Sequence, residues 1–355
     1  MEFFPHKSTL KAMQLPRIVI IGPDALEQVV PTCNKLKLEK STVLICDETT
    51  KTIAGDVIYK NLDQNDFDVQ MKTISNVDKD TLEEVLQLIN ETKAHSVMGI
   101  GGGRPIDTAK YCASHADIPF FSVPTATSHD GIASGRASVT FEGIKASIEA
   151  DPPIAIIADT DIISRAPHRL LISGCGDILA NYSAVADWKL AHRLKGEEFS
   201  NYAAVLSEQT AEMLLANIER IAPNQEESAR VLLKAVVTSG IAMSIAGSSR
   251  PASGSEHMFS HALDKVANIP GLHGEQCGVG SIMMMYLHGL DWEKIRDALS
   301  AINAPVSADA LGVSREELVE ALTIAHEIRP ERYTILAEGL SRETATEVAE
   351  ITGVI

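Results

Sequence analysis

The chain has 355 residues, 45% of them hydrophobic and 22% charged, a composition typical of a globular protein long enough to form two cores. This excludes a small disulfide-stapled scaffold and a disordered chain. The 48 acidic residues outnumber the 31 basic ones, and the formal net charge of −17 would repel a nucleic-acid backbone and an anionic membrane alike. We therefore expect neither nucleic acid nor a membrane as a partner.

The five cysteines are scattered and include no CxxC pair, so neither a disulfide framework nor a thiolate zinc finger is indicated. The chain does not start with a basic stretch followed by an apolar run. The run that we take as most apolar, Ser281 to Leu287, is far shorter than the roughly 20 residues that span a bilayer. We expect a soluble, unprocessed protein of the cytoplasm.

Up to about Ser164, short β-branched runs alternate with helical patterns, which is typical of a parallel sheet with crossover helices. Strands are predicted at 17–21, 42–46, 69–74, 96–100, 119–123 and 154–158. Helices are predicted at 24–36, 49–61, 80–92 and 106–114. Two more strands, at 136–141 and 145–150, have the spacing of a β-hairpin.

Beyond Asp161 the pattern is helical only, with helices predicted at 176–194, 200–221, 226–246, 254–266, 275–288, 291–301, 314–326 and 342–351. We place a domain boundary near Arg165. It separates a Rossmann-like α/β dinucleotide-binding domain with a mostly parallel sheet, residues 1–165, from an all-α metal- and substrate-binding domain, residues 166–355. Because no Pro-rich linker intervenes, the two domains should pack directly and enclose a cleft.

A glycine turn follows the predicted strand at 96–100, in the segment GIGGGRPIDTAK from Gly99 to Lys110. A strand, a glycine turn and a helix start leave free backbone N–H groups at a positive helix end, which suits a pyrophosphate. The spacing is not GxGxxG, because Arg104 stands where the third glycine would be. A plain tight turn is the alternative interpretation.

Asp47 stands at the end of the predicted strand 42–46. In a dinucleotide fold, an acidic residue there accepts hydrogen bonds from the adenosine ribose and repels a 2′-phosphate, which favours NAD(H). A helix cap is the alternative role for an Asp at this place. Further along, the loop PTATSHDGIASG, from Pro124 to Gly135, gathers hydroxyl, imidazole and carboxyl groups after a buried strand. It suits a polar ligand, or is a solvated turn.

A third cluster resembles a metal site. Asp177 lies in GCGDILAN, His257 and His261 lie four residues apart on one helical face in SEHMFSHALD, and His273 follows in GLHGEQCG. One carboxylate with two imidazoles forms a catalytic metal set with an open position. The donor types suit zinc and ferrous iron equally, and each histidine alone could instead be an ordinary hydrogen-bonded residue.

GGGRPIDTAK, PTATSHDGIAS, RASV, GCGDILAN, GSEHMFSHALD and HGEQCG, in this order, resemble the iron-containing alcohol dehydrogenase and dehydroquinate synthase superfamily over nearly the whole chain. SHDGIAS and GSEHMFSHALD are most similar to the archaeal branch that interconverts dihydroxyacetone phosphate and sn-glycerol 1-phosphate, the backbone of archaeal membrane phospholipids. Glycerol dehydrogenases share the glycine turn and the metal scheme but differ in those two segments.

The resemblance implies a dehydrogenase with one zinc ion per subunit and NAD(H) or NADP(H) as cofactor. The implied zinc ligands are Asp177, His257 and His273. The expected catalytic or substrate-binding residues are Asp130, Arg136, Asp177 and His261. The expected cofactor-binding residues are Asp47, Gly101, Gly102, Gly103, Arg104, Pro105, Ile106, Asp107, Thr125, Ala126, Thr127, Ser128 and Ser134.

Several alternatives remain open on the sequence alone. Arg136 is our first choice for the substrate phosphate, with Lys145, Arg165 and Arg250 as rivals that could equally be ion-pair partners on the surface. The nearest alternative function is a glycerol dehydrogenase acting on unphosphorylated polyols. A dehydroquinate synthase-like cyclase and a dinucleotide-binding module without chemistry are the others. We also expect a homo-oligomer.

Overall fold

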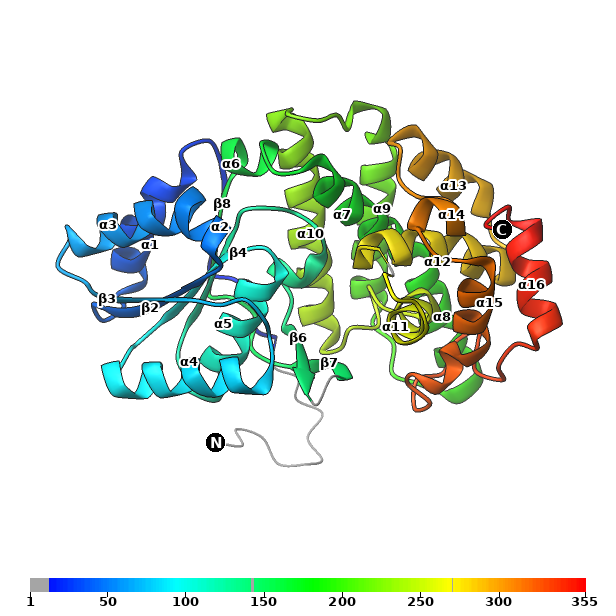
Figure 1. Ribbon diagram of the computed structural model, residues 1–355, viewed down its shortest axis with the longest axis horizontal. Helices are drawn as coiled ribbons and strands as arrows, with labels where there is room; N and C mark the ends of the chain where they lie inside the picture. Colours follow the sequence, from blue (N-terminus) through cyan, green and yellow to red (C-terminus); the bar gives the residue numbers. More distant parts are fainter. Residues whose placement is uncertain (1–12, 142–143, 270) are drawn as a thin grey trace.

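A six-stranded parallel sheet forms the first part of the computed structural model, which describes residues 13–141, 144–269 and 271–355 (Figure 1). The strand order is β1-β8-β5-β4-β2-β3. The strands are β1 (Ile18–Gly22), β2 (Ser41–Cys46), β3 (Asp68–Thr73), β4 (Val97–Gly101), β5 (Phe120–Pro124) and β8 (Ala155–Asp159). Each strand is displaced from its predicted range by at most one residue, because β-branched runs bounded by turn residues are a strong local signal.

The strand order reverses between β2 and β4. The chain runs outward from β2 to β3 on one side, and from β4 through β5 to β8 on the other. The register Val43 to Val97 and Ile45 to Gly99 sets the carboxyl ends of these two strands side by side. In open α/β sheets, ligands bind at such a switch point. Asp47 and the glycine turn therefore meet at the edge where a dinucleotide is expected.

Helices cover both faces of the sheet (Figure 1). Along β2, Leu44 and Cys46 join a buried cluster with one set of helices, whereas Val43 and Ile45 join a second cluster with α4 and α5. The helical elements of this half are η1 (Ala25–Gln28), α1 (Val29–Leu36), α2 (Glu48–Thr50), η2 (Lys51–Gly55), α3 (Asp56–Asp63), α4 (Lys79–Thr92) and α5 (Gly103–His115). The helix predicted at 49–61 is thus divided by the π-helical segment η2.

The predicted β-hairpin is confirmed. Strands β6 (Arg136–Phe141) and β7 (Ile144–Glu149) pair antiparallel, with Arg136 opposite Glu149 and Ser138 opposite Ser147. The two residues between the strands lie outside the described part of the chain. The hairpin packs beside α5, and a bridge from Thr140 to Asp78 joins it to the start of α4. It therefore extends from the sheet toward the second half of the molecule.

The second half is helical, as expected, and the α/β plus all-α fold class is confirmed. Its elements are α6 (Thr160–Ser164), α7 (His168–Leu179), α8 (Asn181–Lys195), α9 (Asn201–Leu215), η4 (Ile218–Arg220), α10 (Glu226–Ala246), α11 (Ser255–Val266), α12 (His273–Leu287), α13 (Trp292–Ala301), α14 (Ala308–Leu311), α15 (Arg315–Ile324), η5 (Ala325–Glu327) and α16 (Arg342–Ile351). In the first half, the loop after β5 contains one further short helix, η3 (Asp130–Ile132). The helix predicted at 176–194 is two helices, α7 and α8, that meet at Ala180. The short helices α6 and α14 have no counterpart among the predictions.

Helix α10 is, by length and composition, apolar enough to cross a membrane. The sequence analysis had singled out only the shorter run at 281–287. More than half of the apolar window of α10 is buried inside the molecule, where the helix packs against α9 and α6. Buried core helices of soluble proteins pass the same test, so α10 alone is weak evidence for a membrane span.

The domain boundary near Arg165 stays a prediction. Arg165 directly follows α6, at the end of the last strand-to-helix connection. A single buried cluster nevertheless runs across this point and includes Ile156 of β8 and Leu232 of α10. The two halves thus share a core instead of meeting only at a surface.

Candidate active site

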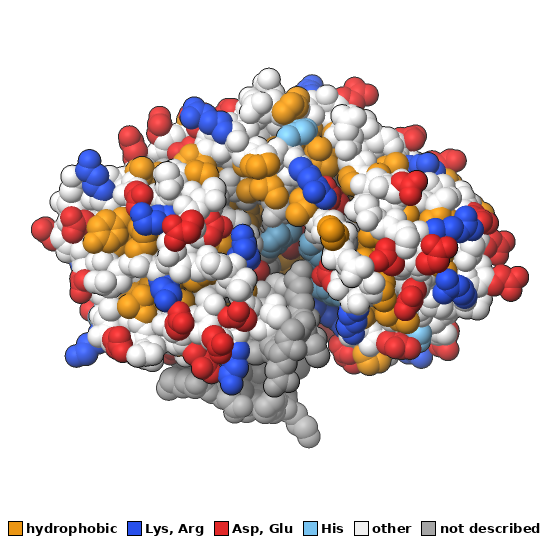
Figure 2. All heavy atoms as spheres, in the orientation of Figure 1, with side chains coloured by type: hydrophobic (Ala, Val, Ile, Leu, Met, Phe, Trp, Pro, Cys, Tyr) orange, Lys and Arg blue, Asp and Glu red, His pale blue; other side chains and the backbone are white. Residues whose placement is uncertain are grey.

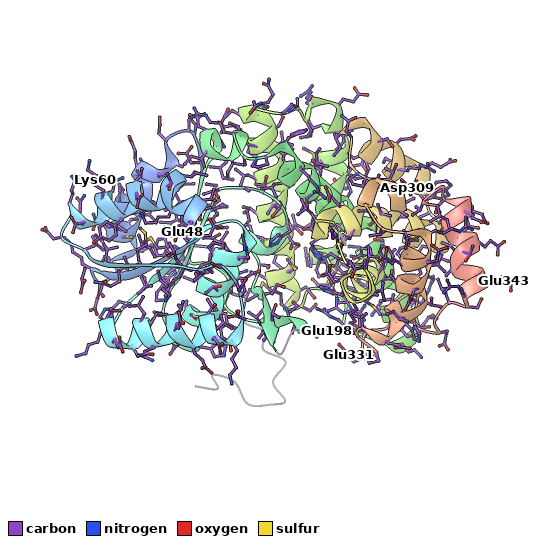
Figure 3. All side chains as sticks on the ribbon, in the orientation of Figure 1. Glu48, Lys60, Glu198, Asp309, Glu331 and Glu343 are labelled. Atoms are coloured by element: carbon purple, nitrogen blue, oxygen red, sulfur yellow. The ribbon has the colours of Figure 1, made fainter. Side chains whose placement is uncertain are left out.

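A cavity of about 490 Å³ lies between the sheet and the helical half. Its walls come from the glycine turn, the loop after β5, the hairpin, α11 and the start of α12. Figure 2 shows histidine side chains inside the hollow between the two halves. Acidic side chains such as Asp309 and Glu343 lie on the outer helices, away from this hollow (Figure 3).

Four side chains beside the cavity could together hold a metal ion. One potential ligand atom from each of Asp177, His257, His273 and Cys277 lies within 4.8 Å of the others. Asp177 Oδ1 is 3.7 Å from His257 Nε2 and 3.9 Å from His273 Nε2. These distances are too long for hydrogen bonds, but ligands bound about 2.0–2.2 Å from a tetrahedral zinc ion stand about 3.3–3.6 Å apart. The three predicted ligands are thus nearly in place.

Close helix packing brings Asp177 and His273 together. Asp177 lies on α7 and His273 begins α12, and a Cβ on Gly274 would approach the carbonyl oxygen of Ser173 to 1.9 Å. Only glycine permits this approach of two helix backbones. Gly274 therefore has a packing role that places two side chains of the cluster next to each other.

The outer nitrogen of each histidine bonds to the protein. His257 Nδ1 lies 2.9 Å from Glu256 Oε1, and because a carboxylate only accepts, the proton is on Nδ1. His273 Nδ1 lies 3.0 Å from the hydroxyl of Ser260, which donates in turn to Gln276 Oε1. Both rings therefore direct an Nε2 lone pair toward Asp177. Such outer partners fix the tautomer and orientation of metal-binding histidines.

The carboxylate of Asp177 lacks a partner on one side. Its Oδ2 accepts a hydrogen bond of 2.8 Å from the backbone N–H of Asp130, whereas its buried Oδ1 has no hydrogen-bond partner among the described residues. Burial, and secondarily the charge of Asp130, raises the pKa of Asp177 to about 7. A buried, unpaired carboxylate oxygen is costly unless a cation neutralises it. The donor set thus fits a metal ion.

Cys277 was not among the predicted residues. It lies one turn after His273 on α12, with its Sγ 3.7 Å from His273 Nε2. The i, i+4 spacing in HGEQCG was a signal that could have found it. His261, predicted as a substrate contact, lies outside the group of four. It lines the cavity, and its ring stacks on that of His273 at 5.7 Å between centroids.

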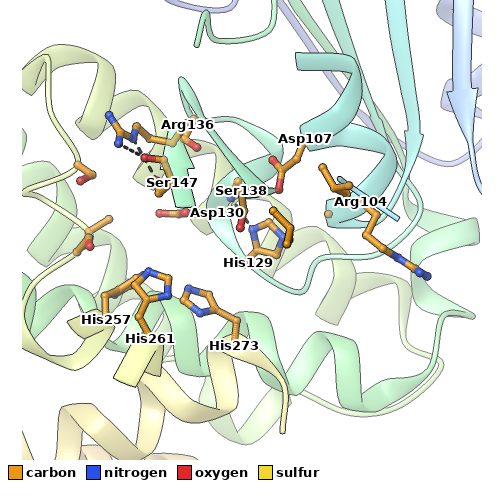
Figure 4. A pocket seen from close by; sticks show the side chains of 18 of the residues that line it. Arg104, Asp107, His129, Asp130, Arg136, Ser138, Ser147, His257, His261 and His273 are labelled. Carbon is orange, nitrogen blue, oxygen red and sulfur yellow. Dashed lines mark hydrogen bonds between the residues drawn. The ribbon is translucent and has the colours of Figure 1, made fainter. Parts of the chain in front are cut away.

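Asp130 lies across the cavity from the histidines (Figure 4). Its Oδ2 accepts a 3.0 Å hydrogen bond from Ser239 on α10, and burial raises its pKa. Lys110, which the sequence analysis did not identify, holds the loop that carries Asp130 through hydrogen bonds. Its fully buried ammonium donates to the carbonyls of Gly131 at 2.5 Å and Arg136 at 2.6 Å. The glycine-turn helix α5 and the loop carrying Asp130 are thereby fastened together.

The glycine turn has the open geometry expected of an anion site. Gly101 ends β4 with φ +149°, and Gly102 caps α5 without a side-chain hydrogen bond. A Cβ on Gly102 would meet nothing within 4 Å, whereas one on Gly103 would lie 2.6 Å from His129 Nε2. The space in front of the turn is therefore open at Gly102, and the His129 ring packs against Gly103. Arg104 and Asp107 both line the cavity, and the Arg104 guanidinium donates to the Ser75 carbonyl. These residues remain predicted cofactor contacts.

Asp47 has the alternative role that the sequence allowed. Its Oδ1 accepts from the backbone N–H of Thr50 at 2.8 Å, and Thr50 Oγ1 accepts from the Asp47 N–H, which together form a capping box at α2. Its Oδ2 is 3.9 Å from the Arg104 guanidinium, beside the glycine turn. A ribose contact by Asp47 stays a prediction.

The other predicted cofactor contacts differ in their exposure to the cavity. Ser134 lines it, whereas Thr125, Ala126 and Thr127 are buried behind it. The buried hydroxyl of Thr127 has no hydrogen-bond partner among the described residues, and its burial shows that this part of the loop is not a solvated turn. Ser128 contributes its carbonyl to the Ser173 hydroxyl.

Of the predicted phosphate ligands, Arg136 lines the cavity. Arg250 is buried in a two-pronged ion pair with Glu197 and is not available, and Arg165 is exposed away from the cavity lining. The side chain of Lys145 lies outside the described part. Arg329, missed by the sequence analysis, is the further arginine of the cavity besides Arg104 and Arg136.

Comparisons with known proteins agree with this geometry. A family model for iron-containing alcohol dehydrogenase matches residues 20–167. Over 355 residues and the full length of both chains, the protein is 51% identical to glycerol-1-phosphate dehydrogenase [NAD(P)+] of Methanosarcina acetivorans.

Two solved structures share the fold at low sequence identity. A probable glycerol dehydrogenase from Sinorhizobium meliloti has a TM-score of 0.79 at 17% identity, covering 96% of this chain and 98% of that chain. Glycerol dehydrogenase from Schizosaccharomyces pombe has a TM-score of 0.79 at 20% identity, covering 97% and 91%. Such likeness establishes the architecture alone.

Proposed function

The chain belongs to the glycerol-1-phosphate dehydrogenase family, within the iron-containing alcohol dehydrogenases, and from this premise we propose that it catalyses the reversible NAD(P)H-dependent reduction of dihydroxyacetone phosphate to sn-glycerol 1-phosphate. The product would supply the glycerophosphate backbone of archaeal membrane phospholipids. The observation that carries the proposal is that a single cavity joins an open helix N-terminus, an Asp-His-His donor set and the guanidinium of Arg136.

Asp177, His257 and His273 would hold a zinc ion, whose chemistry here is Lewis-acid polarisation of the substrate carbonyl toward hydride from the nicotinamide. The protein's own part is to orient these side chains. Glu256 and Ser260 hold the outer nitrogens of the two imidazoles, and the backbone N–H of Asp130 holds one oxygen of Asp177. A zinc ion with three protein ligands would keep a coordination position for the substrate oxygen.

Reduction of a ketone also requires a proton at the new hydroxyl oxygen. His261 and Asp130 are the candidate relay, because both line the cavity beside the donor set. An imidazole both accepts and donates protons near neutral pH, and a carboxylate in hydrogen-bond contact with the substrate hydroxyl can orient it. All five cysteines are buried, which argues against a thiol nucleophile.

Substrate preference tests the proposal. Purified protein is loaded with Zn²⁺ and given NADH or NADPH, and the loss of reduced nicotinamide is followed with dihydroxyacetone phosphate or with dihydroxyacetone. Two charge-assisted hydrogen bonds to the phosphate should favour the phosphorylated ketone at least about 100-fold in kcat/KM. Equal rates would favour the glycerol dehydrogenase alternative, and turnover without net loss of NADH would favour the cyclase. A cytoplasmic location and a homo-oligomer remain further predictions.

A further inference from the structure

Two arginine side chains lie in the same cavity without a carboxylate partner. We propose that Arg136 and Arg329 together form the subsite that binds the phosphate dianion of the substrate; this inference rests on the function proposed above. Figure 4 shows Arg136 on the opposite side of the cavity from Arg104, which directly follows the glycine turn in the sequence. Arg136 therefore lies away from the expected cofactor end.

The hairpin presents Arg136. Its guanidinium donates from NH2 to the Ser147 carbonyl at 2.6 Å and from Nε to the Ser147 hydroxyl at 3.3 Å, both across the β6–β7 pair. These two bonds fix the plane of the guanidinium but supply no negative charge. A guanidinium group held in this way is pre-organised for bidentate contact with a phosphate.

Arg329 lies in the segment after η5 and is half-buried. Both arginines line the same cavity. Burial and, after it, the positive charge of Arg136 lower the pKa of Arg329, whereas the charge of Glu331 raises it. Among the described residues, neither guanidinium forms an ion pair within 4.0 Å of a carboxylate oxygen. Placing two like charges together in a cavity is unfavourable unless an anion neutralises them.

Two other arginines of the helical half do form close ion pairs with carboxylates. Arg250 is bidentate to Glu197, and Arg169 is bidentate to Glu275 at 2.7 Å for each bond. With 48 acidic side chains in the sequence, carboxylate partners are abundant. The lack of one at the cavity end therefore points to a ligand that brings the negative charge itself.

Hydrogen bonds hold the cavity wall beside Arg329 in place. Arg332 donates to the Ser253 carbonyl at 2.6 Å and to the Ser249 hydroxyl at 2.9 Å, and Arg250 donates to the Tyr333 carbonyl at 2.9 Å. These bonds fasten the segment that carries Arg329 to the loop before α11. Ser249 and Ser253 line the cavity, so their hydroxyls can add neutral donors around an anion.

The test uses zinc-loaded full-length protein and the variants Arg329→Met, Arg136→Met and Arg329→Lys. Arg220→Met, which changes an exposed arginine of η4 outside the cavity, is the matched control. Two quantities are measured: the ratio of kcat/KM for dihydroxyacetone phosphate to that for dihydroxyacetone, and the inhibition constant of inorganic phosphate against the phosphorylated ketone.

Each Met variant should lower the ratio about 10- to 100-fold and raise the phosphate inhibition constant by a similar factor, because one charge-assisted pair is lost. Arg329→Lys keeps the positive charge but not the planar guanidinium, so its ratio and its inhibition constant should lie between those of the wild type and Arg329→Met. The control should match the wild type. Circular dichroism and thermal melting verify folding, and Arg136→Met tests the subsite independently if Arg329→Met does not fold.

Unchanged ratios and unchanged phosphate inhibition in the Met variants would overturn the subsite. Failure of the proposed function has a different signature: the wild type itself would reduce dihydroxyacetone as well as its phosphate. Phosphate binding at this subsite is then still decided by calorimetric titration of inorganic phosphate into the wild type and Arg329→Met, where equal affinities would contradict it.

Discussion

Removing the charge of Glu256 should weaken metal binding without unfolding the protein. Glu256 is fully buried and accepts from His257 Nδ1 at 2.9 Å, from the Gly254 N–H at 2.6 Å and from the Ser183 hydroxyl at 2.8 Å. In Glu256→Gln, one carboxylate oxygen becomes an NH₂ group, which can only donate. The NH₂ group takes the place of the oxygen that faces the Ser183 hydroxyl, because the other oxygen accepts from both His257 and Gly254. His257 Nδ1 then donates to a neutral amide oxygen and loses its charge-assisted hydrogen bond.

Loss of an outer partner of this kind typically lowers metal affinity by about 10- to 100-fold, equivalent to about 1.4–2.8 kcal/mol. The assay is competition between the protein and a zinc chelator, with thermal melting as a check on folding. Asp159→Asn is the matched control, because Asp159 is also a buried carboxylate but caps α6 and belongs to neither the cavity lining nor the donor set. Unchanged zinc affinity in Glu256→Gln, or an equal loss in Asp159→Asn, would refute this account of the site.

Three further predictions concern the cluster, the cofactor and the loop. His273→Ala should empty the metal site and abolish turnover, whereas His261→Ala should keep zinc but lose activity; metal analysis of both decides, and a zinc-free His261→Ala would make His261 a ligand. NAD(H) should be used at least as readily as NADP(H), and Asp47→Ser should shift kcat/KM toward NADP(H); a strong NADPH preference that the substitution leaves unchanged would show that Asp47 does not select the cofactor. Lys110→Met should lower the free energy of unfolding by about 3–5 kcal/mol, because Asp107 and the Gly131 carbonyl lose their buried cation. Denaturant titration measures this difference. A loss below about 1 kcal/mol would contradict the prediction, since the loss of a buried ion-pair partner costs more.

Local signals predicted the sheet and the glycine turn. The strand at 97–101 is a buried β-branched run that ends in three glycines, and both features act within a few residues. The start of α7 was missed for the opposite reason. Gly174 and Gly176 disfavour a helix locally, but close packing against Thr127 and Gly274 requires them there. Tertiary contact therefore overrode propensity.

In the site, too, some residues could be predicted from local patterns and others depend on tertiary packing. His257 and His261 share a helical face by spacing alone, and the pattern that makes Asp47 a capping residue, an Asp followed three residues later by Thr50, was visible in the sequence. Arg329 carried no such signal. It follows η5, far along the chain from Arg136, and its nearness to that residue results entirely from the packing of the two halves. No local pattern could have paired them.

The most direct test of the central claim is the identity of the product. Zinc-loaded protein is allowed to consume dihydroxyacetone phosphate with NADH, and the configuration of the glycerol phosphate formed is determined by chiral analysis. We expect one equivalent of sn-glycerol 1-phosphate for each NADH oxidised. Formation of sn-glycerol 3-phosphate, or no phosphorylated product, would contradict the account.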